Sequence, residues 1–208
     1  EAIEEIDRRI NMHHILCKRK SGYIFAATNT SQFRDLHRIH GKLKNFYNYN
    51  NTVLLDQKAL KKWVKTDRYA GGLLDYGSGR FHSVNYLYGL TKAANDIGVQ
   101  LFENSEITKI VREDELIVNT NFGSVKAKTL VLAGNAYLEG LENTSQHKII
   151  RITSTVGVTT PLSIEQINDI LPGATAVADC NNILDYFRIT GDQRLLFGAG
   201  ADYLGRET

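Results

Sequence analysis

Apolar side chains along the chain follow two spacings, one typical of helices and one typical of strands. Ile3, Ile6 and Ile10 recur every three or four residues, which predicts an amphipathic helix over residues 1–13. Similar spacing, with plausible capping residues at Thr30 or Ser31, Asp56 and Ser83, predicts further helices. These are expected over residues 30–49, 57–64, 83–97 and 163–171.

Apolar residues that alternate with polar ones predict strands between these helices. They are expected as a pair about Ser21-Gly22 within 14–28, within 147–160, and over 53–55, 71–75, 99–102, 107–111, 115–120, 125–127, 129–133 and 175–178. Glycines mark turns at Gly77-Ser-Gly79, at Asn121-Phe-Gly123 and at Gly191-Asp192, the last within a hairpin. Helices and strands follow one another irregularly, so the predicted fold class is α+β.

Composition and charge narrow the class of protein. The 208 residues are 42% hydrophobic and 23% charged with a net charge of +2, which gives no electrostatic case for nucleic-acid or membrane binding. Cys17 and Cys180 are the only cysteines, which favours reduced thiols and a cytoplasmic protein. His37 and His40 have helical spacing, but no Cys or carboxylate completes a ligand set, so no metal is expected.

The strongest candidate for chemistry is the segment Asp185–Gly200, which contains the predicted hairpin. Tyr186 and Arg188 are two residues apart, so both side chains project from one face of their strand. A phenol beside a guanidinium suits a small anionic or hydrogen-bonding substrate. The alternative is that Tyr186 is a half-buried strand aromatic and Arg188 a surface charge.

Three other stretches accompany this segment, over residues 71–82, 129–137 and 177–186. In their order and spacing they resemble the FAD-dependent amine and D-amino-acid oxidase (DAO) family, which includes glycine and sarcosine oxidases. The resemblance extends over nearly the whole chain and is greatest to the branch that oxidises γ-glutamylputrescine. It implies a substrate-side mixed β-sheet with covering helices, from residues 1–80 and 145–208, and part of a Rossmann-like FAD-binding domain, from residues 81–144.

The resemblance also implies roles for three residues on the substrate side. Tyr186 would orient the substrate amine or shape the pocket, and Arg188 would hold the substrate carboxylate. His82 is the third candidate, within Gly79-Arg-Phe-His-Ser83, where the family pattern is Gly-His-Leu-His-Pro. The alternative for His82 is a structural histidine that holds the loop before a helix.

For the cofactor, the resemblance implies that Ala133 and Gly134 pack against the pyrophosphate and ribityl region of FAD. Asn135 follows them in the same stretch, and Ile107 would contact the adenine through its backbone. Without the resemblance, Ala133–Asn135 is a plain strand and turn, and Ile107 is a core residue of a strand.

The activity implied is oxidation of a small-molecule amine by hydride transfer to flavin, with aldehyde, ammonia and hydrogen peroxide as products. The leading expected substrate is γ-glutamylputrescine. Glycine, sarcosine or a D-amino acid is the alternative substrate. The chain contains no Gly-x-Gly-x-x-Gly segment, which holds the FAD pyrophosphate in the family, so an internal fragment is expected. Such a fragment could be a catalytically silent substrate domain without flavin, and we expect it to self-associate through exposed apolar surface.

Overall fold

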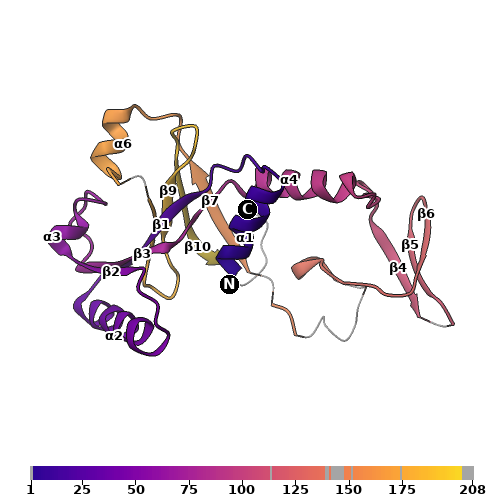
Figure 1. Cartoon of the computed structure of the whole chain (residues 1–208), viewed down its shortest axis with the longest axis horizontal. Helices are drawn as coiled ribbons and strands as arrows, with labels where there is room; N and C mark the ends of the chain where they lie inside the picture. The colour runs from indigo at the N-terminus through magenta and orange to yellow at the C-terminus, as the bar shows by residue number, and fades with distance from the viewer. Residues whose placement is uncertain are drawn as a thin grey trace. The chain divides into compact units, whose positions relative to one another are not determined.

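The computed structural model describes residues 2–112, 114–138, 141, 148–150, 152–173 and 175–202. The chain divides into two compact units (Figure 1). Unit 1 consists of Glu1–Asp96 and Ser154–Ala201, and unit 2 of Ile97–Thr153 and Asp202–Thr208. The sequence placed the corresponding boundaries near residues 80 and 145. The assignment of a substrate side and an FAD side to these parts stays a prediction.

Unit 1 is built around a seven-stranded sheet with the order β2-β3-β1-β8-β9-β10-β7. Its strands are β1 (Lys20–Ala27), β2 (Thr52–Asp56), β3 (Gly71–Arg80), β7 (Thr153–Val158), β8 (Ala176–Asp179), β9 (Tyr186–Ile189) and β10 (Leu195–Asp202). β1 and β8 are parallel, whereas β1 with β3, β2 with β3, β8 with β9 and β9 with β10 are antiparallel. The predicted mixed sheet is therefore confirmed.

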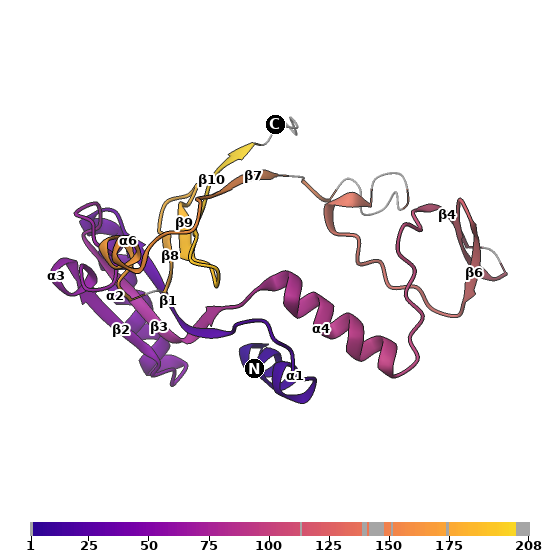
Figure 2. The same cartoon turned by 90° about the horizontal axis from the view of Figure 1, so that it is seen from above.

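Helices cover both faces of this sheet. The helices of unit 1 are α1 (Ala2–Met12), α2 (Thr30–Phe46), α3 (Gln57–Leu60), α4 (Ser83–Asp96) and α6 (Ile164–Ile170). Leu36 of α2 packs with Ala27 and Leu73 on one face. Strand residues of the other parity, such as Ile24 and Leu74, pack with α3 and α6. Figure 1 shows α2 and α6 on opposite sides of the strands, and Figure 2 shows the same elements from above.

The helix starts were predicted well in position and less well in capping residue. The Asp56 side chain accepts a hydrogen bond from the Ala59 N–H at 2.7 Å, as the sequence predicted for α3. The predicted caps Thr30 or Ser31 and Ser83 are wrong. Asn29 caps α2, and the His82 Nδ1 accepts the Asn85 N–H at 3.2 Å at the start of α4. In both cases the side chain of the residue immediately before the helix accepts a backbone N–H of the first turn, three residues further along the chain.

Two predicted turns of unit 1 are wrong, because the glycines on which they were based lie within strands. Gly22 has a φ of +96° where the register shifts between Ser21 and Tyr23, so it forms a bulge within one strand, not a turn between two. Gly77-Ser-Gly79 is part of β3, because Ser21 pairs with Gly79 and Lys20 pairs with Arg80. The extended β3 carries Arg80 to the edge of the sheet.

Unit 2 contains an antiparallel sheet of β4 (Ile107–Arg112), β5 (Leu116–Thr120) and β6 (Gly123–Ala127). The hairpin predicted at Asn121-Phe-Gly123 is confirmed. The strands predicted over residues 99–102 and 129–133 are wrong. An apolar run becomes a strand only when a neighbour completes its hydrogen bonds, and no described residue pairs with either run. The short helix η1 (Asn135–Tyr137) follows the second run.

Three further findings concern the described residues only. The β-rich region predicted over 147–160 contains β7, while His147 lies outside the described residues. Among the described helices, none has the length and apolar character needed to cross a membrane. Within the same residues, His, Cys, Asp and Glu side chains form no group of three that could hold a metal ion.

Candidate functional site

Arg188 and His82, predicted from distant parts of the sequence, line one cavity of unit 1 with a volume of about 520 Å³. Its lining is strongly basic, with five Lys and Arg side chains and a single carboxylate. The basic residues are Lys18, Arg19, Lys20, Arg80 and Arg188, and the acidic residue is Asp192. We call this the cationic cavity. Tyr186 is not among the residues that line it.

Two strand pairings place the arginines of the cationic cavity. Arg188 lies in β9 opposite Leu196 of β10, which also lines the cavity. Arg80 is the last residue of β3, opposite Lys20 at the start of β1. Directly opposed residues of an antiparallel pair project to the same side, so each pair contributes two neighbouring side chains. The Arg80 Nη1 donates to the Ile189 carbonyl oxygen at 2.9 Å, which joins the two regions.

Several charges around the cavity already have partners. The Arg19 Nε lies 2.8 Å from an oxygen of Asp7, and the Lys18 Nζ donates to the Gly191 carbonyl oxygen at 3.3 Å. Asp192 is engaged by Arg194, with 2.9 Å between the Nε and the carboxylate, and hydrogen bonding from Thr190 holds the pKa of Asp192 below its usual range. Burial, followed by the nearby charge of Arg188, lowers the pKa of Arg80.

Tyr186 contacts the neighbouring hairpin strand. Its partner in the register is Gly198 of β10, and a side chain at Gly198 would overlap the phenol ring. The ring therefore occupies the space that Gly198 leaves open, and its hydroxyl lies 3.4 Å from the Ser154 Oγ. The catalytic roles predicted for Tyr186 and Arg188 stay predictions, with Arg188 alone lining the cationic cavity.

His82 combines an exposed position at the cavity with a structural hydrogen bond. Its backbone N–H donates to the Cys17 carbonyl oxygen at 2.6 Å, and its Nδ1 accepts the Asn85 N–H. A neutral ring that accepts at Nδ1 carries its proton on Nε2. The structural alternative raised by the sequence thus has direct support, and a role toward substrate stays a prediction.

Unit 2 brings three of the four predicted cofactor residues together. Ile107, Ala133 and Gly134 line a cavity of about 730 Å³. Asn135 is not among the lining residues and adjoins it at the start of η1, with a φ of +51°. The start of β4 and the 130–138 segment line the same cavity, so it brings together positions that are distant in sequence.

The lining of the unit 2 cavity fits part of a dinucleotide such as FAD. Leucines offer apolar walls for a ring system, while Ser105, Glu106 and Thr108 supply hydroxyl and carboxylate groups for a sugar. A Cβ at Gly134 would lie 3.1 Å from the Leu138 Cγ, with a closer approach to one of its methyl groups, so glycine leaves room for the Leu138 side chain there.

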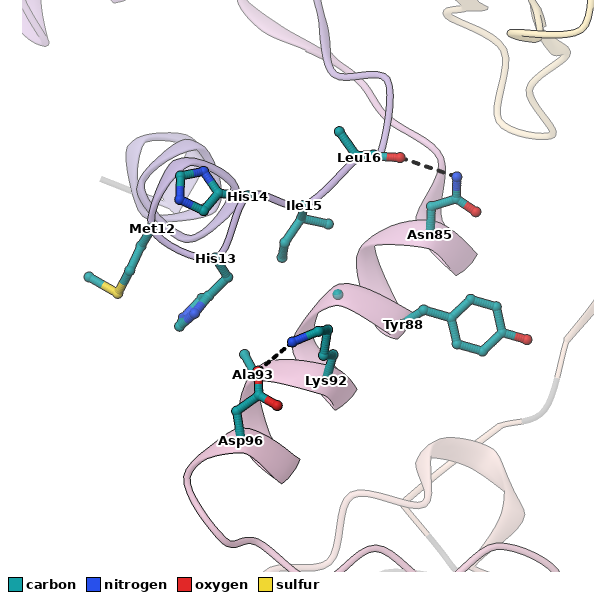
Figure 3. Close-up of a pocket in the computed structure, with 11 residues that line it drawn as sticks. Met12, His13, His14, Ile15, Leu16, Asn85, Tyr88, Lys92, Ala93 and Asp96 are labelled. Carbon is teal, nitrogen blue, oxygen red and sulfur yellow. Dashed lines mark hydrogen bonds and ion pairs between the residues drawn. The ribbon is translucent and has the colours of Figure 1, made fainter.

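A third cavity, of about 650 Å³, lies in unit 1 between the end of α1 and α4 (Figure 3). Figure 3 shows Ile15 pointing toward α4, and a Cβ at Gly89 would overlap the Ile15 side chain. The Asn85 Nδ2 donates to the Leu16 carbonyl oxygen at 3.2 Å across the same contact. None of the seven predicted site residues lines this cavity.

Sequence reasoning missed Arg80 and the lysines of the cationic cavity. Lys18, Arg19 and Lys20 form a short basic run that is also typical of a solvated strand edge. Arg80 stands beside His82 but was not singled out, because only the antiparallel register of β1 with β3 shows that it faces the same cavity as Arg188.

A mixed sheet beside a cavity whose lining suits part of a dinucleotide is what a flavin-linked oxidoreductase requires, and comparison with known proteins gives the family. Residues 1–208 match the FAD dependent oxidoreductase (DAO) family, and the chain belongs to it. FAD is the cofactor of this family.

Two relatives from bacteria are similar over nearly the entire chain. "Probable oxidoreductase OrdL" of Haemophilus influenzae is 36% identical over 204 residues, which are 96% of this chain and 47% of that protein. Gamma-glutamylputrescine oxidoreductase of Escherichia coli is 35% identical over 210 residues, which are 100% of this chain and 49% of that protein. The chain therefore spans about half the length of these curated relatives.

Solved structures agree on the fold. L-proline dehydrogenase from P. horikoshii superposes with a TM-score of 0.76 at 19% identity, covering 95% of this chain and 53% of that one. Glycine oxidase from Geobacillus kaustophilus superposes with a TM-score of 0.70 at 21% identity, covering 97% of this chain and 52% of that one. At such identities the likeness establishes the fold alone.

Proposed function

We propose that this chain supplies the substrate side and part of the cofactor side of an FAD-dependent oxidoreductase that oxidises an amine, with γ-glutamylputrescine as its substrate. One observation carries the proposal: Arg188 lines a cavity whose walls carry five basic side chains and one carboxylate. Such a cavity suits an amine substrate that also bears a carboxylate. The 35% identity to gamma-glutamylputrescine oxidoreductase supports the choice of amine.

The residues of this chain bind and orient the substrate. Arg188 holds the substrate carboxylate through charge-assisted hydrogen bonds, which fixes the amine-bearing carbon relative to the cofactor. Tyr186, on the same strand as Arg188 but outside the lining of the cationic cavity, would orient the amine where the substrate extends beyond that cavity, while Ile107, Ala133 and Gly134 would contact FAD. FAD held by these residues would supply the two-electron oxidation of the amine to an imine, whose hydrolysis gives the aldehyde and ammonia, with dioxygen reduced to hydrogen peroxide as the final electron acceptor.

The direct test uses the protein expressed from its complete reading frame. We expect a visible flavin spectrum that bleaches when γ-glutamylputrescine is added without oxygen. Bound flavin that bleaches only with glycine, sarcosine or a D-amino acid would overturn the substrate and retain the oxidoreductase. A purified, folded protein that binds no added FAD would overturn the proposal and favour a substrate-domain module without flavin.

A further inference from the structure

Positive charge is concentrated at one end of unit 1. Residues 30–68, which contain α2, β2 and α3, include nine Lys and Arg and three Asp, a net charge of +6, whereas the whole chain carries +2. All nine basic residues are exposed. We call residues 30–68 the basic end. The net charge of the whole chain hides this region, because the remaining residues are negative in sum.

The basic end is one continuous part of the fold, because α2 and α3 both pack on β2, the strand at one edge of the sheet. Leu54 of β2 packs with Leu36 of α2. On the other face of the sheet, Leu55 of β2 packs with Leu60 of α3. Figures 1 and 2 both show α2, β2 and α3 together at the same end of unit 1. Cations of both helices therefore flank one edge of the sheet.

The carboxylates of the basic end are already engaged within it. Asp35 is paired with Arg38, and Asp67 is paired with Lys61. The Asp56 side chain caps α3. Within the described residues, no ion pair is formed by the other cations of α2, which are Arg34, Lys42 and Lys44. Much of the positive charge is therefore open to an anion outside the chain.

Large apolar side chains are exposed beside these cations on α2. Ile39, Phe46 and Tyr47 are 48%, 75% and 59% exposed. Lys42 is three residues after Ile39 and four before Phe46, so these three side chains follow one stripe of the helix. The Phe46 and Tyr47 ring centroids are 4.9 Å apart, and the Lys42 Nζ lies 6.0 Å from the Tyr47 ring centroid. The surface thus combines cations with exposed aromatic rings.

We propose that the basic end is a docking surface for an anionic membrane. Phospholipid headgroups attract the cations, while the apolar and aromatic side chains of α2 enter the boundary between headgroups and acyl chains. A nucleic-acid backbone would also attract the cations, but its phosphates offer no apolar surface to Ile39 and Phe46. The inference goes beyond the proposed function and does not depend on it.

The test is co-sedimentation of lipid vesicles with the protein expressed from its complete reading frame. Vesicles of equimolar phosphatidylcholine and phosphatidylglycerol present the anionic surface, and vesicles of phosphatidylcholine alone are the neutral control. At low ionic strength we expect binding to the anionic vesicles only. Added salt should reduce that binding, because it screens charges at an exposed surface.

Three variants assign the binding surface. Lys42→Gln combined with Lys44→Gln is expected to weaken binding to the anionic vesicles about 10- to 30-fold. Phe46→Ser keeps every charge and should weaken binding about 10-fold, because the ring no longer transfers out of water. The matched control, Arg9→Gln combined with Lys92→Gln, removes the same net charge from exposed positions of α1 and α4, away from the basic end in both figures. It should change binding less than about twofold.

Each outcome decides the proposal. No binding to the anionic vesicles, or binding that added salt leaves unchanged, would overturn it. Equal losses in the Lys42→Gln, Lys44→Gln variant and in the control variant would make net charge alone responsible and remove the basic end. Unchanged binding in Phe46→Ser, or tighter binding to double-stranded DNA than to the anionic vesicles, would overturn the membrane as the partner.

Two features keep the test decisive. If a variant does not fold by circular dichroism, the lipid and salt dependence of the unchanged protein still decides between membrane binding and its absence. Flavin bleaching by an amine is a separate measurement on the same protein. Loss of vesicle binding would therefore overturn the docking surface and leave the proposed function standing, and the converse result would do the opposite.

Discussion

At the scale of single residues, Gly79 lies against backbone atoms of β1 beside the cationic cavity. A Cβ at this position would overlap the Lys20 carbonyl oxygen and lie 3.0 Å from the Ser21 Cα. Both neighbours are backbone atoms of β1, which cannot move aside as a flexible side chain can. The exclusion of a side chain at Gly79 is therefore part of what keeps Arg80 at the edge of the cavity.

We predict that Gly79→Ala lowers the free energy of unfolding by about 1–3 kcal/mol, the usual cost of overpacking. Gly157→Ala in β7 is the matched control, since its added Cβ would have no neighbour within 4 Å. It should change stability by less than about 0.5 kcal/mol. Urea denaturation of both variants measures the difference, and equal stabilities would contradict the assigned contact.

The pattern of a single strand was enough to place Arg188, but not its neighbour Arg80, in the candidate site. Arg188 could be proposed from the alternation of a single strand, because the face of a strand follows from residue parity. Arg80 could not, because its neighbours in space depend on the register of β3 against β1 and on the position of the β9 hairpin. Such pairings arise from tertiary packing and leave no local signal.

At the scale of elements, two helices carry a glycine in their interior with opposite surroundings. Gly41 of α2 has open space where its Cβ would be, whereas Gly89 of α4 is covered by Ile15, which is 6% exposed. Helix propensity favours alanine at both positions by the same amount. Packing alone distinguishes them.

Gly41→Ala is accordingly expected to stabilise the protein by about 0.5–1 kcal/mol. Gly89→Ala should destabilise it, because displacing Ile15 costs about 1–3 kcal/mol and exceeds the gain in helix propensity. Thermal unfolding followed by circular dichroism compares the two. Stabilisation by both substitutions would show that Ile15 does not pack on α4 as Figure 3 draws it.

Helices were easier to predict than strands because their hydrogen bonds are internal. The apolar spacing of Ile3, Ile6 and Ile10 was enough to locate α1. The apolar run over 129–133 had strand composition, but no described residue supplies a partner, and Val131 is 81% exposed. Gly22 shows a related limit, since a glycine with positive φ forms a bulge or a turn according to what its flanking residues pair with.

At the scale of the whole molecule, large apolar side chains are exposed in both units. Among the residues whose burial is described, the most exposed are Leu16, Phe122, Val131 and Ile97, each at 81% or more. Exposure of this kind favours association. We predict that sedimentation velocity of the 208-residue chain shows species larger than a monomer at micromolar concentration. A single monomeric boundary across a concentration series would contradict this expectation.

The family, the mixed sheet and the two cavities support one account, in which Arg188 holds the substrate carboxylate for oxidation at FAD. Its most direct test is anaerobic stopped-flow reduction of the flavin in the protein from the complete reading frame, as a function of γ-glutamylputrescine concentration. Arg188→Gln should raise the apparent dissociation constant about 10- to 100-fold, while Lys58→Gln leaves it unchanged. An identical dissociation constant in Arg188→Gln and the unchanged protein would contradict the account.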